Sequence, residues 1–424
     1  MAKYKVNIPV STLVPGGQNA CLLQQSAAHC TRCNSCLQSC PAYLLNPQET
    51  FSPRGRVQLI RLLSEGKISL DVSDPLLKEI AFSCTLCARC TAACAGQIPV
   101  AHHMLALRNA LEKQPLPDTL RLFLFAYGKY PGLFHWITCS GLFLRRLGFA
   151  NLLRPLLPKW LKHAQAILPA KTGSFRRLLH RQKIQTQPEK PQSIYLPSLY
   201  TQYIDPQAGL LVYKRLAAKQ PVLLLGQATG WFEYMYGNRT RCLQIAKKVL
   251  LTWEKYSIQR PLPLITDSIE LYSFLKNYPL LFDKIPGWKQ RAQTFAKHIQ
   301  FITDLPFSSG EKNRNQRIAL DTSSVLYPAT EPAERAQKIL SALYGKNLLQ
   351  CAYSAVPLPA ASIGFASDSN TAILLHKNIR DIARQQIDTV YCLSAWSALE
   401  LNAVLPLKYP SAQAQFFIYA GADE

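Results

Sequence analysis

The chain has 424 residues, of which 48% are hydrophobic and 17% charged, so it is long enough for several domains with buried cores and is not a disordered polymer. Its 48 Lys and Arg residues outnumber 25 Asp and Glu residues, and the net charge of +23 favours an anionic partner such as a nucleic acid, an acidic protein or a membrane surface. The first residues lack the apolar stretch of an export signal, so we expect a cytoplasmic protein with reduced cysteines.

Two cysteine motifs of the same spacing lie in the N-terminal part. The first reads C-x2-C-x2-C-x3-C-P, and the second repeats this spacing without the final proline. Three thiolates spaced three residues apart can wrap one face of a cubane cluster, while the fourth points away and reaches a second cluster. This is the bacterial arrangement of paired [4Fe-4S] clusters.

We therefore expect two [4Fe-4S] clusters that exchange one ligand each. The first cluster would bind Cys30, Cys33, Cys36 and Cys94, and the second Cys84, Cys87, Cys90 and Cys40. Zinc and disulfides are the alternatives. Structural zinc sites draw their cysteines from two separated pairs, and disulfides require an oxidising compartment, so both alternatives fit the motifs less well.

The stretch between the motifs has a helical pattern. Helix starts are predicted at the capping residues Ser52 and Asp74, each followed by proline, and a third helix after Pro99; the first helix should stop near Gly66. About forty residues of this pattern between the motifs predict an all-helical ferredoxin domain instead of a small βαβ ferredoxin. Arg54 and Arg56 fall in the first helix, where they either raise a cluster's reduction potential or form a solvated basic face.

Residues 119–190 hold 13 Lys and Arg against the single acid Glu189, so this stretch supplies +12 of the net charge. It is also rich in large aromatic side chains: Phe123, Phe125, Phe134, Trp136, Phe143 and Trp160. Charged residues and prolines interrupt it too often for a membrane span. We expect amphipathic helices that contact a membrane surface or pack under the rest of the chain, followed by an exposed connector over residues 171–204.

The remaining sequence alternates short apolar runs with helical patterns, which is typical of parallel α/β units. Strands are predicted at residues 221–226, 263–265, 317–321, 389–392 and 415–419, and helices at 240–253, 333–344 and 371–386. The fold class is thus α+α/β and multidomain. The predicted parts are a helical ferredoxin domain at 1–118, a basic helical region and linker at 119–204, and two α/β lobes at 205–312 and 313–424.

The chain resembles the iron-sulfur subunit of glycolate oxidase and the related heterodisulfide reductase-like family. The resemblance lies in the two cysteine motifs, the segment Ser52-Pro53-Arg54-Gly55-Arg56 and the order of the C-terminal modules. It implies an electron-transfer subunit that takes electrons from a flavoprotein oxidising a 2-hydroxy acid and passes them toward membrane quinones. Together with the basic region at 119–190, this leads us to expect a cytoplasmic protein that is peripheral on the inner face of the membrane.

The C-terminal modules depart from this family. Each usually carries a Cys-Cys-Gly signature, whereas only Cys242, Cys351 and Cys392 follow residue 139 here, far apart in sequence. We therefore interpret the lobes as a docking scaffold without a third redox site. No nicotinamide or flavin fingerprint accompanies the clusters, so substrate chemistry falls to a partner. The alternatives are a nucleic-acid-binding iron-sulfur protein, the iron-sulfur subunit of a complex like anaerobic glycerol-3-phosphate dehydrogenase, and an interaction protein that keeps its clusters for folding.

Overall fold

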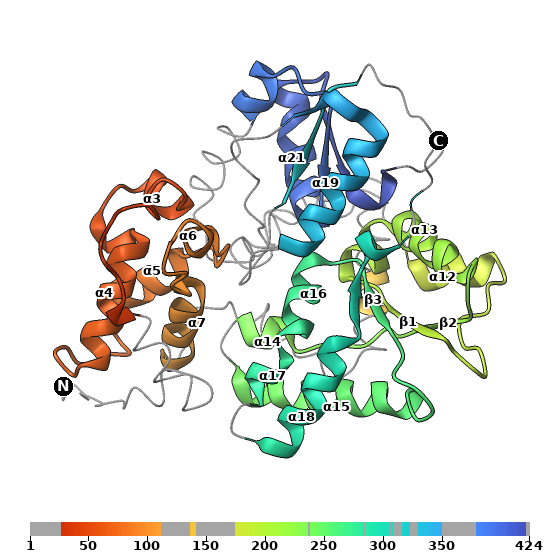
Figure 1. Cartoon of the computed structure of the whole chain (residues 1–424), viewed down its shortest axis with the longest axis horizontal. Helices are drawn as coiled ribbons and strands as arrows, with labels where there is room; N and C mark the ends of the chain where they lie inside the picture. The colour runs from red at the N-terminus through yellow and green to blue at the C-terminus, as the bar shows by residue number, and fades with distance from the viewer. Residues whose placement is uncertain are drawn as a thin grey trace.

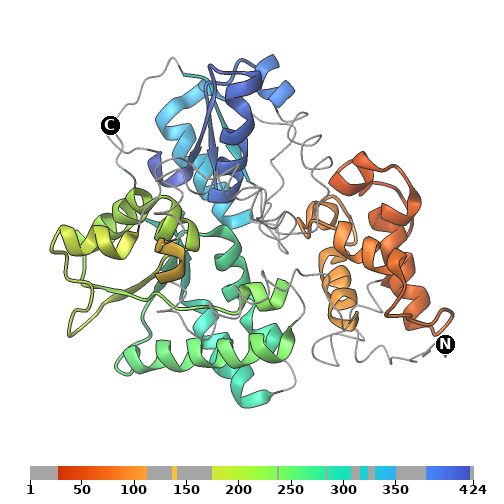
Figure 2. The same ribbon diagram turned by 180° about the vertical axis from the view of Figure 1, so that it is seen from behind.

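The computed structural model describes residues 27–111, 136–140, 174–235, 238–282, 285–305, 307, 316–322, 330–349 and 379–420. Helices form the N-terminal part, and two parallel sheets with flanking helices form the rest, so the mixed fold class is confirmed. Figures 1 and 2 show the N-terminal helices, red to orange, beside the two sheets. Within the described ranges, no helix is long and apolar enough to cross a membrane.

The N-terminal helices begin and end where local capping signals predict. They are α3 (Pro41–Leu45), η1 (Glu49–Phe51), α4 (Pro53–Ser64), α5 (Pro75–Ser83), α6 (Arg89–Ala92) and α7 (Val100–Ala110). The hydroxyl of Ser52 accepts a hydrogen bond from the amide of Gly55 at 2.8 Å, and the Asp74 carboxylate accepts one from Leu76 at 2.8 Å. Gly66, with φ of +68°, follows the end of α4 and adopts the left-handed conformation that glycine favours.

Helices α4 and α5 both pack against α7 and set the distance between the two cysteine loops. Val57, Ile60, Met104 and Leu107 are among the buried side chains of this core. Burying each such side chain contributes roughly 1.5–3 kcal/mol. Because the first cysteine loop leads directly into α3 and the second begins at the end of α5, packing of the helices holds the two loops in a fixed relation.

The two sheets share one topology. The first contains β1 (Ser193–Leu196), β2 (Val222–Leu224), β3 (Leu264–Thr266) and β4 (Ile299–Phe301) in the order β2-β1-β3-β4, with all neighbours parallel. The second contains β5 (Ile318–Asp321), β6 (Leu348–Leu349), β7 (Thr389–Cys392) and β8 (Gln413–Phe416) in the order β6-β5-β7-β8, also parallel. The same order in both sheets makes them a structural repeat.

Helices connect the strands of both sheets. Those of the first are α12 (Phe175–Arg181), η3 (Tyr200–Ile204), α13 (Pro206–Ala217), α14 (Trp231–Met235), α15 (Arg239–Tyr256), α16 (Ile269–Lys276), α17 (Tyr278–Leu281), α18 (Pro286–Lys297) and η4 (Ile302–Asp304). Those of the second are α19 (Thr330–Tyr344), η5 (Gly345–Asn347), α21 (Ala395–Lys408) and η6 (Phe417–Tyr419). The predicted helices at 240–253 and 333–344 match α15 and α19.

Residues 171–204 differ from the exposed connector predicted for them. They contain α12, η3 and β1, and the four residues of β1 are all buried because this strand lies in the middle of its sheet. The last strand also differs: β8 ends at Phe416, and a 3-10 turn follows where the sequence predicts strand. Most of the basic region at 119–173 and most of the helix predicted at 371–386 lie outside the described residues. The domain limits stay a prediction.

The two sheets meet through the ends of their third strands. Ser268 follows β3 and precedes α16, and Ser394 holds the equivalent place between β7 and α21. Both hydroxyls donate to the buried carboxylate of Glu270, one to each oxygen. At the same junction, Tyr419 donates to the Asp205 carboxylate at 2.8 Å, so contacts between lobes include both polar and apolar groups.

Candidate metal centres

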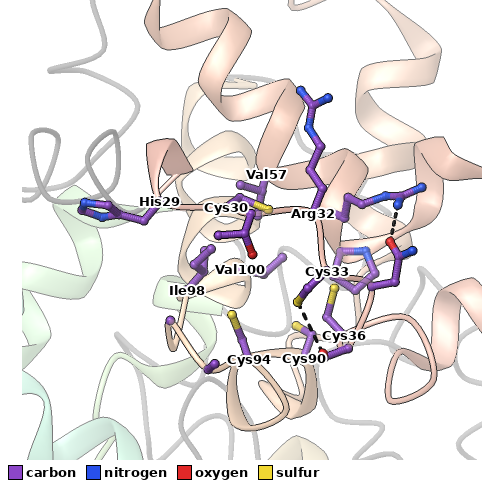
Figure 3. Close-up of a pocket in the computed structure, with 17 residues that line it drawn as sticks. His29, Cys30, Arg32, Cys33, Cys36, Val57, Cys90, Cys94, Ile98 and Val100 are labelled. Carbon is purple, nitrogen blue, oxygen red and sulfur yellow. Dashed lines mark hydrogen bonds between the residues drawn. The ribbon is translucent and has the colours of Figure 1, made fainter.

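The first cysteine loop and the segment after α6 together surround a cavity of about 140 Å³. The cysteines that line it are Cys30, Cys33, Cys36, Cys90 and Cys94. Figure 3 shows their sulfur atoms around the opening, with Ile98 and Val100 forming an apolar wall. The cavity is several times the ~30 Å³ share of one liquid water, so it has room for a group of several atoms.

The electrostatic neighbours of Cys36 are the other members of the first predicted ligand set. Burial raises the pKa of the Cys36 thiol, and the nearby Cys30, Cys94 and Cys33 add to the rise. Cys33 is exposed, and a hydrogen bond with the Ser35 hydroxyl lowers its pKa. The structure thus brings together the first four predicted cysteines from two stretches of the chain.

The second predicted set is gathered deeper in the helical part. Burial raises the pKa of Cys40 to about 11, with Arg56 acting in the opposite direction and Cys84 and Cys87 adding to the rise. Burial raises the pKa of Cys90 as well, and Cys87, Cys84 and Cys40 contribute further. Cys40 therefore lies with the cysteines of the second motif and not with its own. That these eight thiols ligate clusters stays a prediction.

Both cysteine loops repeat one unusual backbone conformation. Arg32 and Asn34 have φ of 58° and 72°, and the matching positions of the second motif, Leu86 and Ala88, both have φ of 55°. Left-handed backbone costs a residue other than glycine roughly 1–2 kcal/mol. Such turns aim successive N–H groups at one point and form anion-binding concavities, including those of many iron-sulfur sites. The sequence gives little sign of this, because neither leucine nor alanine favours the left-handed region.

The start of α4 lies between the two cysteine sets. Arg54 and Arg56 are two residues apart, so their side chains leave the helix about 200° apart. Arg54 lines the cavity of the first set, donates to both oxygens of Glu49 at 2.7 and 2.8 Å, and donates to the side chain of Asn34 in the first loop. It therefore holds one of the left-handed residues in place.

Arg56 faces the second set and is buried, with 1% of its surface exposed. Its guanidinium donates to the sulfur of Cys40 at 3.7 Å and to the hydroxyl of Ser83 at 2.9 Å, and its Nε has no partner in the described part of the chain. A solvated basic face, one of the two sequence interpretations, is therefore wrong for Arg56. A buried cation is costly unless negative charge lies nearby, and anionic thiolates would supply it.

Arg108 is a further buried cation that the sequence analysis did not single out. It donates to the backbone carbonyls of Ala81 and Cys84 at 3.0 and 2.7 Å and lies 4.8 Å from the centre of the Phe82 ring. These contacts tie α7 to the start of the second cysteine loop. The spacing of the sequence does indicate its burial, because Arg108 follows Met104 by four residues and therefore shares the apolar face of α7.

The later cysteines do not join these sets in the described residues. Cys242 is buried in α15, a helix of the first sheet's unit, and Cys392 at the end of β7 in the second sheet, and Cys351 lies outside the described residues. Among the described side chains, no group of three or more His, Cys, Asp or Glu residues is arranged to hold a single metal ion. The thiols of Figure 3 surround a cavity instead of converging on one point.

Comparison with known proteins places the cysteine loops in a described family. Residues 26–98, which contain all eight motif cysteines, match the family model of the "4Fe-4S dicluster domain". The "Probable glycolate oxidase iron-sulfur subunit" of Bacillus subtilis (strain 168) is 24% identical over 319 residues, which cover 70% of this chain and 69% of that protein. The chain is related to the glycolate oxidase iron-sulfur subunits. The resemblance seen in the motifs is confirmed.

A second relative supports the same kinship over a shorter length. The "Glycolate oxidase iron-sulfur subunit" of Escherichia coli (strain K12) is 32% identical over 149 residues, or 34% of this chain and 32% of that protein. No solved structure gives a significant match. Since the Bacillus alignment spans 319 residues, kinship of this iron-sulfur protein reaches beyond its motifs into the lobes that lack the Cys-Cys-Gly signature.

Proposed function

We propose that this chain is the electron-transfer subunit of a flavin-dependent dehydrogenase complex that oxidises a 2-hydroxy acid of the glycolate or lactate type. A flavoprotein partner would supply the electrons, and the chain would pass them toward the quinone pool. The single observation that carries the proposal is the gathering of eight cysteines into two crossed sets within a dicluster domain. The names of the relatives support the substrate class.

The ligand assignment follows the neighbours of each thiol. We assign Cys30, Cys33, Cys36 and Cys94 to one [4Fe-4S] cluster and Cys84, Cys87, Cys90 and Cys40 to the other. The contacts of Cys36 support the first set, and those of Cys40 and Cys90 support the second. When bound, a [4Fe-4S] cluster accepts and releases one electron at a time.

The chain's own residues would position and tune the two sites. Backbone amides in the left-handed turns of both loops would donate to anionic sulfur, and Arg54 fixes the first loop through Asn34. Arg56 of α4 donates to Cys40 and to Ser83 at the end of α5, and Arg108 of α7 donates to the carbonyl of Cys84, where the second loop begins. Packing of α4 and α5 against α7 accompanies the burial of Cys40 and Cys90 in the second set. The two α/β lobes would serve as the scaffold on which the flavoprotein docks.

Anaerobic affinity purification of the tagged chain from its native host tests the proposal. We expect a flavin-containing subunit to elute with the chain, and addition of glycolate or lactate to reduce the clusters of the eluted complex. Glycerol 3-phosphate serves as the comparison substrate, because the glycerol-3-phosphate alternative predicts reduction with it instead. Elution of nucleic acid without any flavoprotein would overturn the proposal in favour of the nucleic-acid alternative.

A further inference from the structure

We propose that the exposed loop of residues 29–35 is the surface on which a redox protein with acidic residues around its cofactor docks, so that the site of Cys30, Cys33, Cys36 and Cys94 exchanges electrons with it. The inference rests on the proposed function, because it takes both cysteine sets as electron carriers. It adds that the two sites are not equivalent, one facing the partner and the other being more deeply buried.

Exposure separates the two sites. In the first, Cys33 is exposed and the flanking Thr31, Arg32 and Asn34 are exposed with it. In the second, no cysteine is exposed: Cys84 and Cys87 are half-buried, and Cys40 and Cys90 keep 6% and 8% of their surface. The rate of electron tunnelling falls steeply with distance, so a partner resting on the loop reaches the first site far more readily than the second.

Helices α4, α5 and α7 cover part of the second site. The buried guanidinium of Arg56 lies against Cys40, and Arg108 lies against the carbonyl of Cys84 and over the ring of Phe82. These groups belong to α4, α5 and α7, which pack together. A redox protein that approached from their side would be separated from the second site by packed side chains.

The chemistry of the loop selects an acidic partner. The residues lining the cavity include Arg32, Arg54 and His29 and no Asp or Glu. The carboxylate of Glu49 pairs with Arg54, whereas the exposed Arg32 donates to the neutral amide oxygen of Gln58 at 3.2 Å and interacts with Glu49 only at longer range. Polar rims with an excess of one charge are typical of transient electron-transfer contacts, where charge steers association.

Paramagnetic relaxation tests which of the two clusters lies closer to the protein surface. The reduced holoprotein carrying both clusters would be titrated with an anionic dysprosium chelate, and the power saturation of each EPR signal followed. Cys94→Ser and Cys40→Ser, which remove a ligand from different sets, assign the two signals. We expect the chelate to relax the signal that Cys94→Ser alters. Relaxation of the signal that Cys40→Ser alters, or equal relaxation of both, would overturn the inference.

Reoxidation by small redox ions tests the charge of the loop without the partner. We expect Arg32→Glu to slow reoxidation by ferricyanide several-fold and to speed reoxidation by hexaammineruthenium(III). Lys219→Glu is the matched control, because it makes the same charge change at an exposed turn after α13. Equal rates in the two variants would refute the docking surface. Failure to load iron and sulfide would instead refute the proposed function, since it leaves nothing to reoxidise.

Discussion

The guanidinium of Arg56 donates a hydrogen bond to the sulfur of Cys40 at 3.7 Å inside the helical part of the protein. Ser83 holds the same guanidinium from α5 at 2.9 Å, so the cation cannot turn away without losing both contacts. A positive charge fixed beside a thiolate favours the more negative, reduced state of anything that the thiolate ligates. Arg54, two residues earlier, has its charge offset by Glu49.

We expect Arg56→Gln to lower the midpoint potential of the cluster that Cys40 ligates. Loss of one nearby charge removes roughly 2 kcal/mol at an effective dielectric constant near 20, or ~90 mV for a one-electron couple. Arg54→Gln is the control, and its effect should be smaller and fall on the other cluster. An EPR-monitored redox titration measures both potentials. Equal shifts of the two clusters in Arg56→Gln would contradict the arrangement of α4 between the sites.

The start of α4 could be predicted from sequence because its signals are local. Ser52, Pro53 and the stop at Gly66 act on the backbone within a few residues of themselves. The burial of Arg56 could not be predicted, because the groups that make it tolerable belong to Cys40 and Ser83, which other parts of the chain bring to it.

Strand β1 was missed for a related reason. Ile194, Tyr195 and Leu196 form a short apolar run among polar residues and prolines, and their burial comes from β2 and β3 on either side. Local composition therefore gave the wrong prediction. The grouping of the thiols was predictable in outline, since the spacing of each motif sends its fourth cysteine away from the other three. The left-handed turns at Leu86 and Ala88 were not, because neither residue type prefers this backbone region.

Exchange of ligands predicts crossed effects of cysteine substitution. Iron and acid-labile sulfide should each approach about eight per chain after anaerobic purification, as two [4Fe-4S] clusters require. Cys40→Ser should damage the cluster held by Cys84, Cys87 and Cys90, although Cys40 belongs to the first motif. EPR of the reduced protein reports which signal changes. Loss of only the other signal would contradict the assignment, and two zinc ions without sulfide would contradict the clusters.

Gly55 is expected to tolerate no side chain. A Cβ atom there would overlap the carbonyl oxygen of Glu49, so the backbone between η1 and α4 would have to move. We expect Gly55→Ala to destabilise the protein by several kcal/mol, on the order of an overpacked core, and to reduce cluster loading. Thermal unfolding and iron content measure the two effects.

Gly287 provides the control, because it lies in the first turn of α18 and a methyl group added there would meet open space. Gly287→Ala should stabilise the helix by about 0.5–1 kcal/mol. If both alanine variants behave alike, the close approach at Gly55 does not constrain the chain.

Glu270 should make the junction of the two sheets sensitive to pH. Burial raises the pKa of its carboxyl above the ordinary 4.5, and neighbouring Asp267 adds to the rise. The folded state therefore binds the proton more tightly than the unfolded state. The contribution to stability is fully present below pH 4.5 and is lost as pH rises through the folded pKa.

Glu270→Gln removes this titration and keeps a group that can bond Ser268 and Ser394. We expect the melting temperature of the variant, relative to the unsubstituted chain, to rise between pH 5 and pH 8. Glu334→Gln makes the same substitution at an exposed position of α19, and its melting-temperature difference should stay nearly constant over this range. A difference for Glu270→Gln that does not change with pH would show that the buried carboxyl does not titrate between pH 5 and pH 8.

The basic region at 119–190 leads to the last prediction, that it binds an anionic membrane surface or a membrane-bound partner. Its +12 charge is interleaved with Phe123, Trp136 and Phe143. Each Lys or Arg near an anionic membrane contributes about 1 kcal/mol to the free energy of binding, and salt weakens this contribution. Inserted aromatic side chains add a part of the binding that resists salt.

Vesicle flotation decides whether the basic region binds membranes or packs under the rest of the chain. The holoprotein should float with vesicles containing anionic lipid at low salt, partly detach at high salt, and stay behind with neutral vesicles. The test variant changes five cations to glutamine: Arg145, Arg146, Arg154, Lys159 and Lys162. It should no longer float, because the lost cations supply the reversible part of the binding and the aromatics alone are too few to hold the chain. If the variant floats as well as the unsubstituted chain, or if neither floats while cluster content is normal, the aromatic residues other than Trp136, which is exposed, belong to the protein core and the cations face water.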